Sequence, residues 1–178
     1  VAFSINQSDA ITAVSENLRD ETYKTFTIEK EIAVIYNFVD VQRFTRKPID
    51  AFRKVIAPNG ERILMHASNF RKIKRVQDVV KIFHEVLKEM PAKLLFVGDG
   101  PERSTAEDLA REMGVFDEIR FVGKQEQMED ILAIADLFLL TSDYESFGLA
   151  ALEAMAAGVP VVSTNAGGLS EININGET

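Results

Sequence analysis

Short apolar segments alternate with helical segments from residue 62 onward, and this alternation most constrains the fold. The apolar segments are nearly continuous, as in Leu137-Phe-Leu-Leu140, which is typical of strands buried on both faces. Between the first two segments, apolar residues recur at helical spacing from Val76 to Met90, and Pro91 ends that pattern. We expect strands at residues 62–67, 93–97, 119–122, 137–140 and 160–163. This order predicts an α/β fold, a parallel sheet with helices on both faces.

A smaller unit is expected before residue 41. Two strand-like segments, residues 10–14 and 32–36, flank a helix that Ser15 is placed to cap. A turn and a polar segment at residues 43–48 follow, which indicates a junction between domains. We therefore expect residues 1–40 to be the end of a first domain with its linker, and residues 41–178 to be a second domain. The expected helices are at residues 16–26, 76–90, 103–114, 128–135 and 145–157.

The composition excludes several classes of protein. The 178 residues contain no cysteine, so disulfides and thiolate metal sites are excluded. A net charge of −8 argues against a broad nucleic-acid-binding surface. No segment is apolar enough for a membrane span and no signal peptide is visible, so we expect a cytoplasmic protein. Because the chain starts at Val1 without Met and stops in a turn-like segment, we expect an interior segment of a longer protein, truncated within its second domain.

Two carboxylates lie where the fourth strand of this sheet meets the next helix. In parallel sheets, ligands bind outside the carboxyl ends of the strands, which is where Glu145 is expected. The free amides of Phe147, Gly148 and Leu149 at the helix start suit a phosphate group. Carboxylates repel phosphate but accept hydrogen bonds from hydroxyls, so this combination predicts a sugar nucleotide.

Glu153, eight positions after Glu145, lies among apolar residues of the same helix. Helical side chains lean towards the N-terminus of their helix, so Glu153 is expected to point towards the site where Glu145 lies. The alternative makes Glu145 a capping acid and Glu153 a surface residue. An unpaired carboxylate among apolar neighbours is costly, so we favour a functional pair.

A basic loop is expected at the same edge of the sheet. Four of the five residues from Arg71 to Arg75 are basic in an acidic chain, which suits a diphosphate. A solvated helix start, or a short basic patch for nucleic acid, would explain the same residues. Basic charge at a helix start is mildly unfavourable by itself, which favours the diphosphate.

Other motifs carry weaker signals. Gly98-Asp-Gly100 lets backbone approach a ligand, but it would equally serve a tight turn. It is no dinucleotide fingerprint, because Arg103 occupies the third glycine position. His66 and His84 have no metal-ligand partner at usable spacing, so we interpret them as core or surface histidines. Without an Asp-x-Asp pair, no metal site is expected and metal independence is predicted.

Together these motifs resemble the family-4 retaining glycosyltransferases of the GT-B fold. The Glu145-x7-Glu153 spacing, Val-Gly-Asp-Gly-Pro at 97–101, Lys74 and Gly-Gly-Leu-Ser-Glu at 167–171 match that family. Residues 35–40 resemble its interdomain strand and turn. The resemblance implies the C-terminal half of such an enzyme, a Rossmann-like domain that binds a nucleotide-sugar donor.

The resemblance also implies roles by matched position. Glu153 would hold the ribose hydroxyls and Glu145 those of the transferred sugar, while Lys74 would hold the diphosphate with the helix amides. The family usually has arginine where Asn69 stands, and we expect Arg71 to replace it. The implied catalytic residues are Lys74, Arg71 and Glu145. The implied donor-binding residues are Asn69, Gly98, Lys124 (through nearby backbone at the base edge), Ser146, Phe147, Gly148, Leu149 and Glu153.

Within that family, residues 68–71, 145–149 and 163–168 are most similar to enzymes of bacillithiol biosynthesis. The implied reaction moves N-acetylglucosamine from UDP-N-acetylglucosamine to a small acceptor such as L-malate, without a cofactor. A homo-oligomer is left open. Alternatives are a lipid, phospho-inositol or polysaccharide acceptor, a non-catalytic nucleotide-sensing module, and a dinucleotide dehydrogenase. We expect this segment alone to bind UDP weakly and to transfer no sugar.

Overall fold

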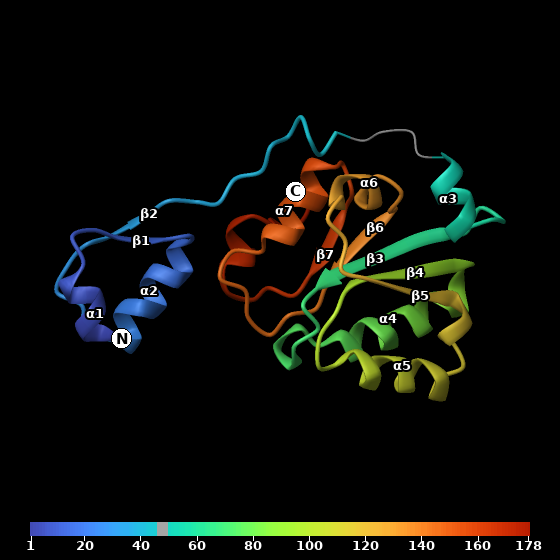
Figure 1. Ribbon diagram of the computed structural model, residues 1–178, viewed down its shortest axis with the longest axis horizontal. Helices are drawn as coiled ribbons and strands as arrows, with labels where there is room; N and C mark the ends of the chain where they lie inside the picture. Colours follow the sequence, from blue (N-terminus) through green and yellow to red (C-terminus); the bar gives the residue numbers. More distant parts are fainter. Residues whose placement is uncertain (46–49) are drawn as a thin grey trace.

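A five-stranded parallel sheet forms the centre of the larger part of the molecule (Figure 1). The computed structural model describes residues 1–45 and 50–178. The strands lie in the order β5-β4-β3-β6-β7, and every neighbouring pair is parallel. Their bounds are β3 (Arg62–Ser68), β4 (Ala92–Gly98), β5 (Ile119–Gly123), β6 (Leu137–Leu140) and β7 (Val161–Ser163). The predicted α/β fold is confirmed.

Helices cover both faces of this sheet, so its core has two layers. In Figure 1, α4 (Val76–Glu89) and α5 (Arg103–Glu112) lie below the sheet, and α6 (Met128–Leu132) and α7 (Leu149–Ala156) lie above it. Alternate residues of β4 divide between the layers: Leu94 and Phe96 pack with α4 and α5, while Leu95 and Val97 pack with α6 and α7. This alternation buries the strands on both sides, as their continuous apolar sequence predicts.

A small parallel βαβ unit precedes the sheet and lies to its left in Figure 1. It consists of β1 (Ile11–Ala13), α2 (Glu16–Thr25) and β2 (Ile32–Val34), preceded by α1 (Ala2–Gln7). The Ser15 hydroxyl accepts a hydrogen bond from the Leu18 amide, which confirms the predicted helix cap. The segment after β2 then runs across to the larger part of the molecule.

The structure corrects one predicted boundary that matters for the site. The helix expected from residue 145 begins at Leu149, with Gly148 at its N-cap. Residues 145–148 are therefore an irregular loop, which we call the Glu145 loop. Gly148 has φ 94°, outside the helical region, so the chain reaches the helix only at the next residue.

Several short helices were not predicted. They are α1, α3 (Asp50–Ile56), and the 3-10 helices η1 (Lys72–Lys74), η2 (Phe116–Glu118) and η3 (Gly167–Glu171). Such short segments lack enough turns for a visible apolar period. Residues 46–48 of the polar segment expected at the junction lie outside the described residues. Within the described ranges, no helix is long and apolar enough to cross a membrane.

Candidate functional site

The strand order reverses between β3 and β6, and this reversal positions the candidate site. From β3 the chain adds β4 and β5 on one side of the sheet, then returns to place β6 and β7 on the other. Ligands of open parallel sheets bind at such a switch point, outside the carboxyl ends of the strands. A hollow of about 250 Å³ lies there, which we call the Lys74 hollow. Its lining includes Ser68, Asn69, Lys74, Glu145, Gly148 and Leu149.

Lys74 and Glu145 form an ion pair inside this hollow. Lys74 Nζ lies 2.5 Å from Glu145 Oε1, and the side chains are only 18% and 13% exposed. The Ser142 hydroxyl donates a further hydrogen bond to the same carboxylate oxygen, at 2.8 Å. Reduced contact with water strengthens such a charged pair. Sequence reasoning placed both residues in the site but did not predict that they bind each other.

The position of Lys74 depends on the end of β6. The Thr141 hydroxyl contacts the carbonyl oxygens of Lys74 and Arg75 at 2.9 and 3.1 Å. Arg75 ends η1 in the left-handed conformation, with φ 49°. The basic loop is thus fastened to the strand that carries the Glu145 loop, which explains how residues 71 positions apart meet.

The Glu145 loop rests on the backbone of η3. The Gly168 amide donates to the Glu145 carbonyl at 2.8 Å. A Cβ added at Gly167 would lie 2.2 Å from that carbonyl oxygen, and Gly167 has φ 59°. A side chain at this position would therefore displace the loop. The glycine pair at 167–168 matched a family pattern, and the structure gives its physical reason.

Backbone amides at the start of α7 are available to a ligand. The first amide there with a helix-type bond is that of Ala151, which donates to the Gly148 carbonyl at 2.9 Å. Across the described part of the chain, the Phe147, Gly148 and Leu149 amides have no hydrogen-bond acceptor. Such free donors at a helix start suit an anion, although the anion itself stays a prediction.

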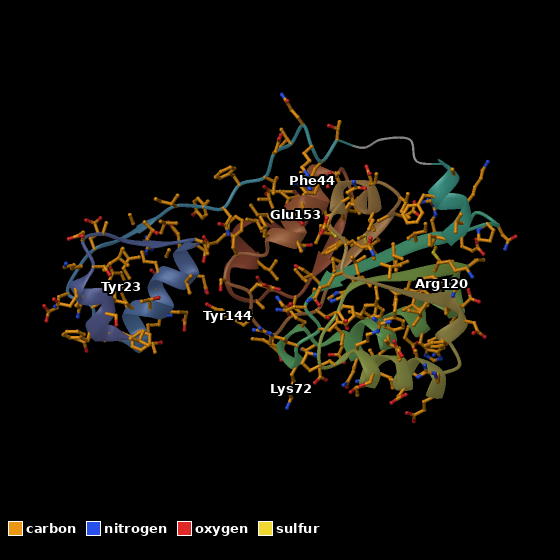
Figure 2. The ribbon with its side chains drawn as sticks, viewed as in Figure 1. Tyr23, Phe44, Lys72, Arg120, Tyr144 and Glu153 are labelled. Carbon is orange, nitrogen blue, oxygen red and sulfur yellow. The ribbon has the colours of Figure 1, made fainter. Side chains whose placement is uncertain are left out.

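Glu153 lines a second hollow, of about 270 Å³, which we call the Glu153 hollow. Figure 2 shows Phe44 close to Glu153 on α7. Phe38, Asp40 and Arg43 also line this hollow, and Leu149 is shared with the Lys74 hollow. The two glutamates therefore lie in adjacent hollows on either side of one leucine.

The environment of Glu153 disfavours its charge. Burial raises the pKa of its carboxyl; Arg43 opposes that rise and Glu129 adds to it. The Arg43 guanidinium is committed elsewhere, since it donates to Glu129 Oε2 at 3.0 Å. No hydrogen bond reaches the Glu153 carboxylate from any residue that the structure describes. Hydroxyl donors of a ligand would satisfy it.

The remaining predicted residues are placed less centrally. Asn69 lines the Lys74 hollow, but Arg71 is exposed and is not among its lining residues, so replacement of the family arginine by Arg71 stays a prediction. Lys124 is exposed just after β5. A Cβ at Gly98 would lie 1.8 Å from the Ser68 carbonyl oxygen, so this glycine is required by the packing of β4 on β3. Close packing of two strands therefore accounts for this glycine, and its place beside the donor stays a prediction.

His66 is a satisfied core histidine, as predicted. Its Nδ1 lies 2.9 Å from the Leu139 carbonyl oxygen, and its Nε2 lies 2.8 Å from the Ser68 hydroxyl. A carbonyl can only accept, so Nδ1 carries the proton and the Ser68 hydroxyl donates to Nε2. Burial lowers the pKa of His66 to about 4, which keeps the ring neutral. The histidine thereby fixes Ser68 at the edge of the Lys74 hollow.

Sequence reasoning missed residues 38–40, 43 and 44 as lining of the Glu153 hollow and missed one contact from the first unit. Arg43 carries no local pattern that places it beside Glu129, 86 residues later. Ser15 was predicted only as a helix cap, yet its hydroxyl also donates to the Ser146 carbonyl. No periodic signal encodes contacts between segments so far apart.

Comparisons with known proteins agree with this geometry. The family model described as "Glycosyl transferases group 1" matches residues 49–178. N-acetyl-alpha-D-glucosaminyl L-malate synthase of Bacillus anthracis is 45% identical over 100% of this chain and 47% of that protein. Glycogen synthase of Mycobacterium tuberculosis is 35% identical over 98% of this chain and 42% of that protein.

Solved structures share the fold. HepE of Anabaena in complex with UDP-glucose matches with a TM-score of 0.88 and 21% identity, over 96% of this chain and 49% of that one. The chain spans about half the length of the curated relatives it matches. Since the family model covers most of the chain, this protein belongs to the group 1 family of glycosyl transferases.

Proposed function

We propose that this chain is the donor-binding half of a retaining glycosyltransferase that moves N-acetylglucosamine from UDP to L-malate. The observation that carries this proposal is the pair of adjacent hollows at the switch point, one with Lys74 and Glu145, the other with Glu153. The 45% identity to an N-acetyl-alpha-D-glucosaminyl L-malate synthase supports the choice of donor and acceptor.

We also propose that residues 1–40 belong to the first, acceptor domain and its linker, and residues 41–178 to the second domain. The β1–β2 sheet has only two strands, too few to be stable alone in water. Exposed apolar side chains on this unit, such as Phe3 and Ile35, are consistent with further packing partners. An acceptor site in the first domain would leave this segment unable to transfer sugar by itself.

In the Lys74 hollow, the diphosphate would compete with Glu145 for Lys74. Lys74 would turn to the β-phosphate, and the released Glu145 would accept hydrogen bonds from the sugar hydroxyls. As the glycosidic bond breaks, negative charge grows on the β-phosphate next to Lys74, Arg71 and the amides of the α7 start. A preorganised donor of this kind lowers the barrier by about 3 kcal/mol. Retention would follow if the acceptor attacks from the side that UDP leaves.

In the Glu153 hollow, the ribose hydroxyls would donate to the desolvated carboxylate. Backbone near Lys124 would read the base edge, with Gly98, Asn69 and Ser146 completing the donor surface. Metal independence, a cytoplasmic location and a homo-oligomer stay predictions. Polysaccharide and lipid acceptors are the alternative. It is supported by relatives named as a glycogen synthase and an alpha-monoglucosyldiacylglycerol synthase.

A ligand screen tests the donor. Unfolding of the full-length protein is followed with UDP-N-acetylglucosamine, UDP-glucose, GDP-mannose or NAD, and transfer to L-malate is assayed in parallel. A ligand at a hundred times its Kd stabilises the folded state by about 2.7 kcal/mol, which gives a clear shift in Tm. We expect the largest shift with UDP-N-acetylglucosamine. A shift with NAD alone would sink the donor proposal, and UDP binding without transfer to any acceptor would favour a nucleotide-sensing module.

The ribose role has its own test. We expect Glu153→Ala to weaken UDP binding about tenfold, because one charge-assisted hydrogen bond is worth about 1.5 kcal/mol or more. Glu112→Ala, which removes an exposed acid from the end of α5, is the matched control. Titration by calorimetry measures both affinities, and equal UDP affinity in the two variants would exclude the ribose role.

A further inference from the structure

The N-terminus of α2 is bound by residues of the larger part of the molecule. The Glu171 carboxylate accepts hydrogen bonds from the amides of Glu16 and Asn17, at 2.9 and 2.8 Å. The fully buried Ser15 hydroxyl donates to the Ser146 carbonyl at 2.6 Å. Three hydrogen bonds thus join one turn of α2 to η3 and to the Glu145 loop.

The chemistry of this contact makes it specific. A helix start carries unpaired amides and a partial positive charge, and a carboxylate satisfies both. Each oxygen of Glu171 takes one amide, so the carboxylate fixes the direction of α2 as well as its position. Ser15 has two partners, because it also accepts from the Leu18 amide at 3.0 Å.

Tyr36, at the start of the linker, joins the same contact. Burial and the nearby carboxylates of Glu16 and Glu171 raise the pKa of its hydroxyl, and its ring centroid lies 6.1 Å from that of Phe147. Phe147 belongs to the Glu145 loop and is only 4% exposed. The segment after β2 and the Glu145 loop therefore pack together close to Glu171.

The same short helix supports the candidate catalytic loop directly. Glu171 ends η3, whose second residue, Gly168, donates its amide to the Glu145 carbonyl. The Glu145 loop is thus held from η3 on one side and from Ser15 on the other. Glu171 itself lines neither the Lys74 hollow nor the Glu153 hollow.

We propose that Glu171 is a positioning residue for the transfer reaction. By docking the start of α2 onto η3, it sets the place of the Glu145 loop relative to the first-domain segment. This inference rests on the proposed function, since it assumes that Glu145 contacts the transferred sugar. It separates two roles: the hollows bind the donor, and the Glu171 contact aligns the bound sugar with groups of the other domain.

The test compares Glu171→Ala, Glu171→Gln and the control Glu177→Ala in the full-length protein. Glu177 is an exposed acid six residues later, so its variant makes the same charge change away from α2. In Glu171→Ala we expect amide exchange at Glu16, Asn17 and Gly168 to accelerate at least tenfold, because the first two lose their acceptor and the third donates to the Glu145 carbonyl. We expect kcat to fall about tenfold while the Kd for UDP stays within twofold. Glu171→Gln keeps one carbonyl oxygen as an acceptor. Its exchange rates and its kcat should therefore lie between those of wild type and of Glu171→Ala.

Two outcomes decide against the inference. Faster exchange with an unchanged kcat would make Glu171 a structural tie only. A loss of UDP affinity together with the loss of kcat would mean that the substitution also disturbs the donor hollows. If Glu171→Ala does not fold, the same measurements on Glu171→Gln decide. A wild-type protein without transfer would sink the proposed function, and exchange at Gly168 would still decide whether Glu171 holds the Glu145 loop.

Discussion

Glu145 and Glu153 belong to one motif, yet the structure gives them opposite surroundings. Glu145 is neutralised by Lys74 and also bonded by Ser142. Glu153, on the other side of Leu149, has its pKa raised by burial while Arg43 is committed to Glu129. A ligand at Glu145 must therefore displace a cation, whereas a ligand at Glu153 supplies hydrogen bonds that are missing. The motif spacing does not reveal this difference.

The comparison suggests a division of labour between the hollows. The Lys74 hollow holds its charges in a pair that a diphosphate would separate, so its residues should govern the chemical step. The Glu153 hollow holds a carboxylate whose charge becomes favourable when hydroxyls arrive, so it should govern nucleotide affinity. Variants on the two sides should accordingly change different measured quantities.

Removal of Lys74 should give the largest effect. In full-length Lys74→Ala we expect transfer to fall about a hundredfold, since a cation aimed at the β-phosphate is lost. Lys72→Ala is the control, because Lys72 lies two residues away and lines neither hollow. Steady-state kinetics with circular dichroism as a folding check measures this. Unchanged turnover would remove Lys74 from the mechanism and break the proposed division.

Acid should lower the free energy of unfolding through His66, the residue that holds Ser68 at the edge of the Lys74 hollow. The pKa of His66 is about 4 in the folded protein against 6.5 unperturbed, so the unfolded chain binds the proton more tightly. The free energy of unfolding should therefore fall as pH drops from about 6.5 to about 4, by about 3 kcal/mol from this residue. Urea unfolding of wild type and His66→Gln across that range measures the difference, with His84→Gln as matched control. Parallel curves for wild type and His66→Gln would contradict the assignment.

Alanine variants of two glycines distinguish the cost of backbone strain from the cost of displacing the Glu145 loop. Gly158 and Gly167 both have positive φ, but only Gly167 has backbone within reach of an added Cβ. Gly158→Ala should cost about 1 kcal/mol of stability. Gly167→Ala should cost about 2 kcal/mol or more and also reduce transfer, because it displaces the Glu145 carbonyl. Equal losses of stability and activity in the two variants would show that η3 does not support the loop.

The smallest expected effect is a gain of stability in Glu153→Gln. Because the pKa of Glu153 is raised on folding, its charge opposes the folded state at neutral pH. The neutral glutamine should make the protein slightly more stable near pH 7, and this advantage should shrink as falling pH protonates the wild-type carboxyl. Urea unfolding at two pH values measures it. A Glu153→Gln variant less stable than wild type near pH 7 would indicate a partner for Glu153 and remove the contrast with Glu145.

Local patterns allowed much of the fold to be predicted. Continuous apolar strands, the helical period from Val76 and the cap at Ser15 each depend on neighbours along the chain, and each was confirmed. The start of α7 was placed four residues too early, because Glu145 resembles a helix-start acid while the chain becomes helical only after Gly148. Lys74 and Glu145, predicted for the same site, do lie together, whereas Arg71 does not line their hollow; their roles stay predictions.

The sequence by itself determined the alternating α/β order, the burial of the strands and the edge of the sheet that carries polar loops. These follow from apolar periodicity and from the rule for parallel strands, both of which are local or general. Only the tertiary structure decided which charges meet: Lys74 with Glu145, Arg43 with Glu129, and Glu171 with the start of α2. The physical reason is distance along the chain, because these partners lie 71, 86 and 155 residues apart and are brought together only by packing.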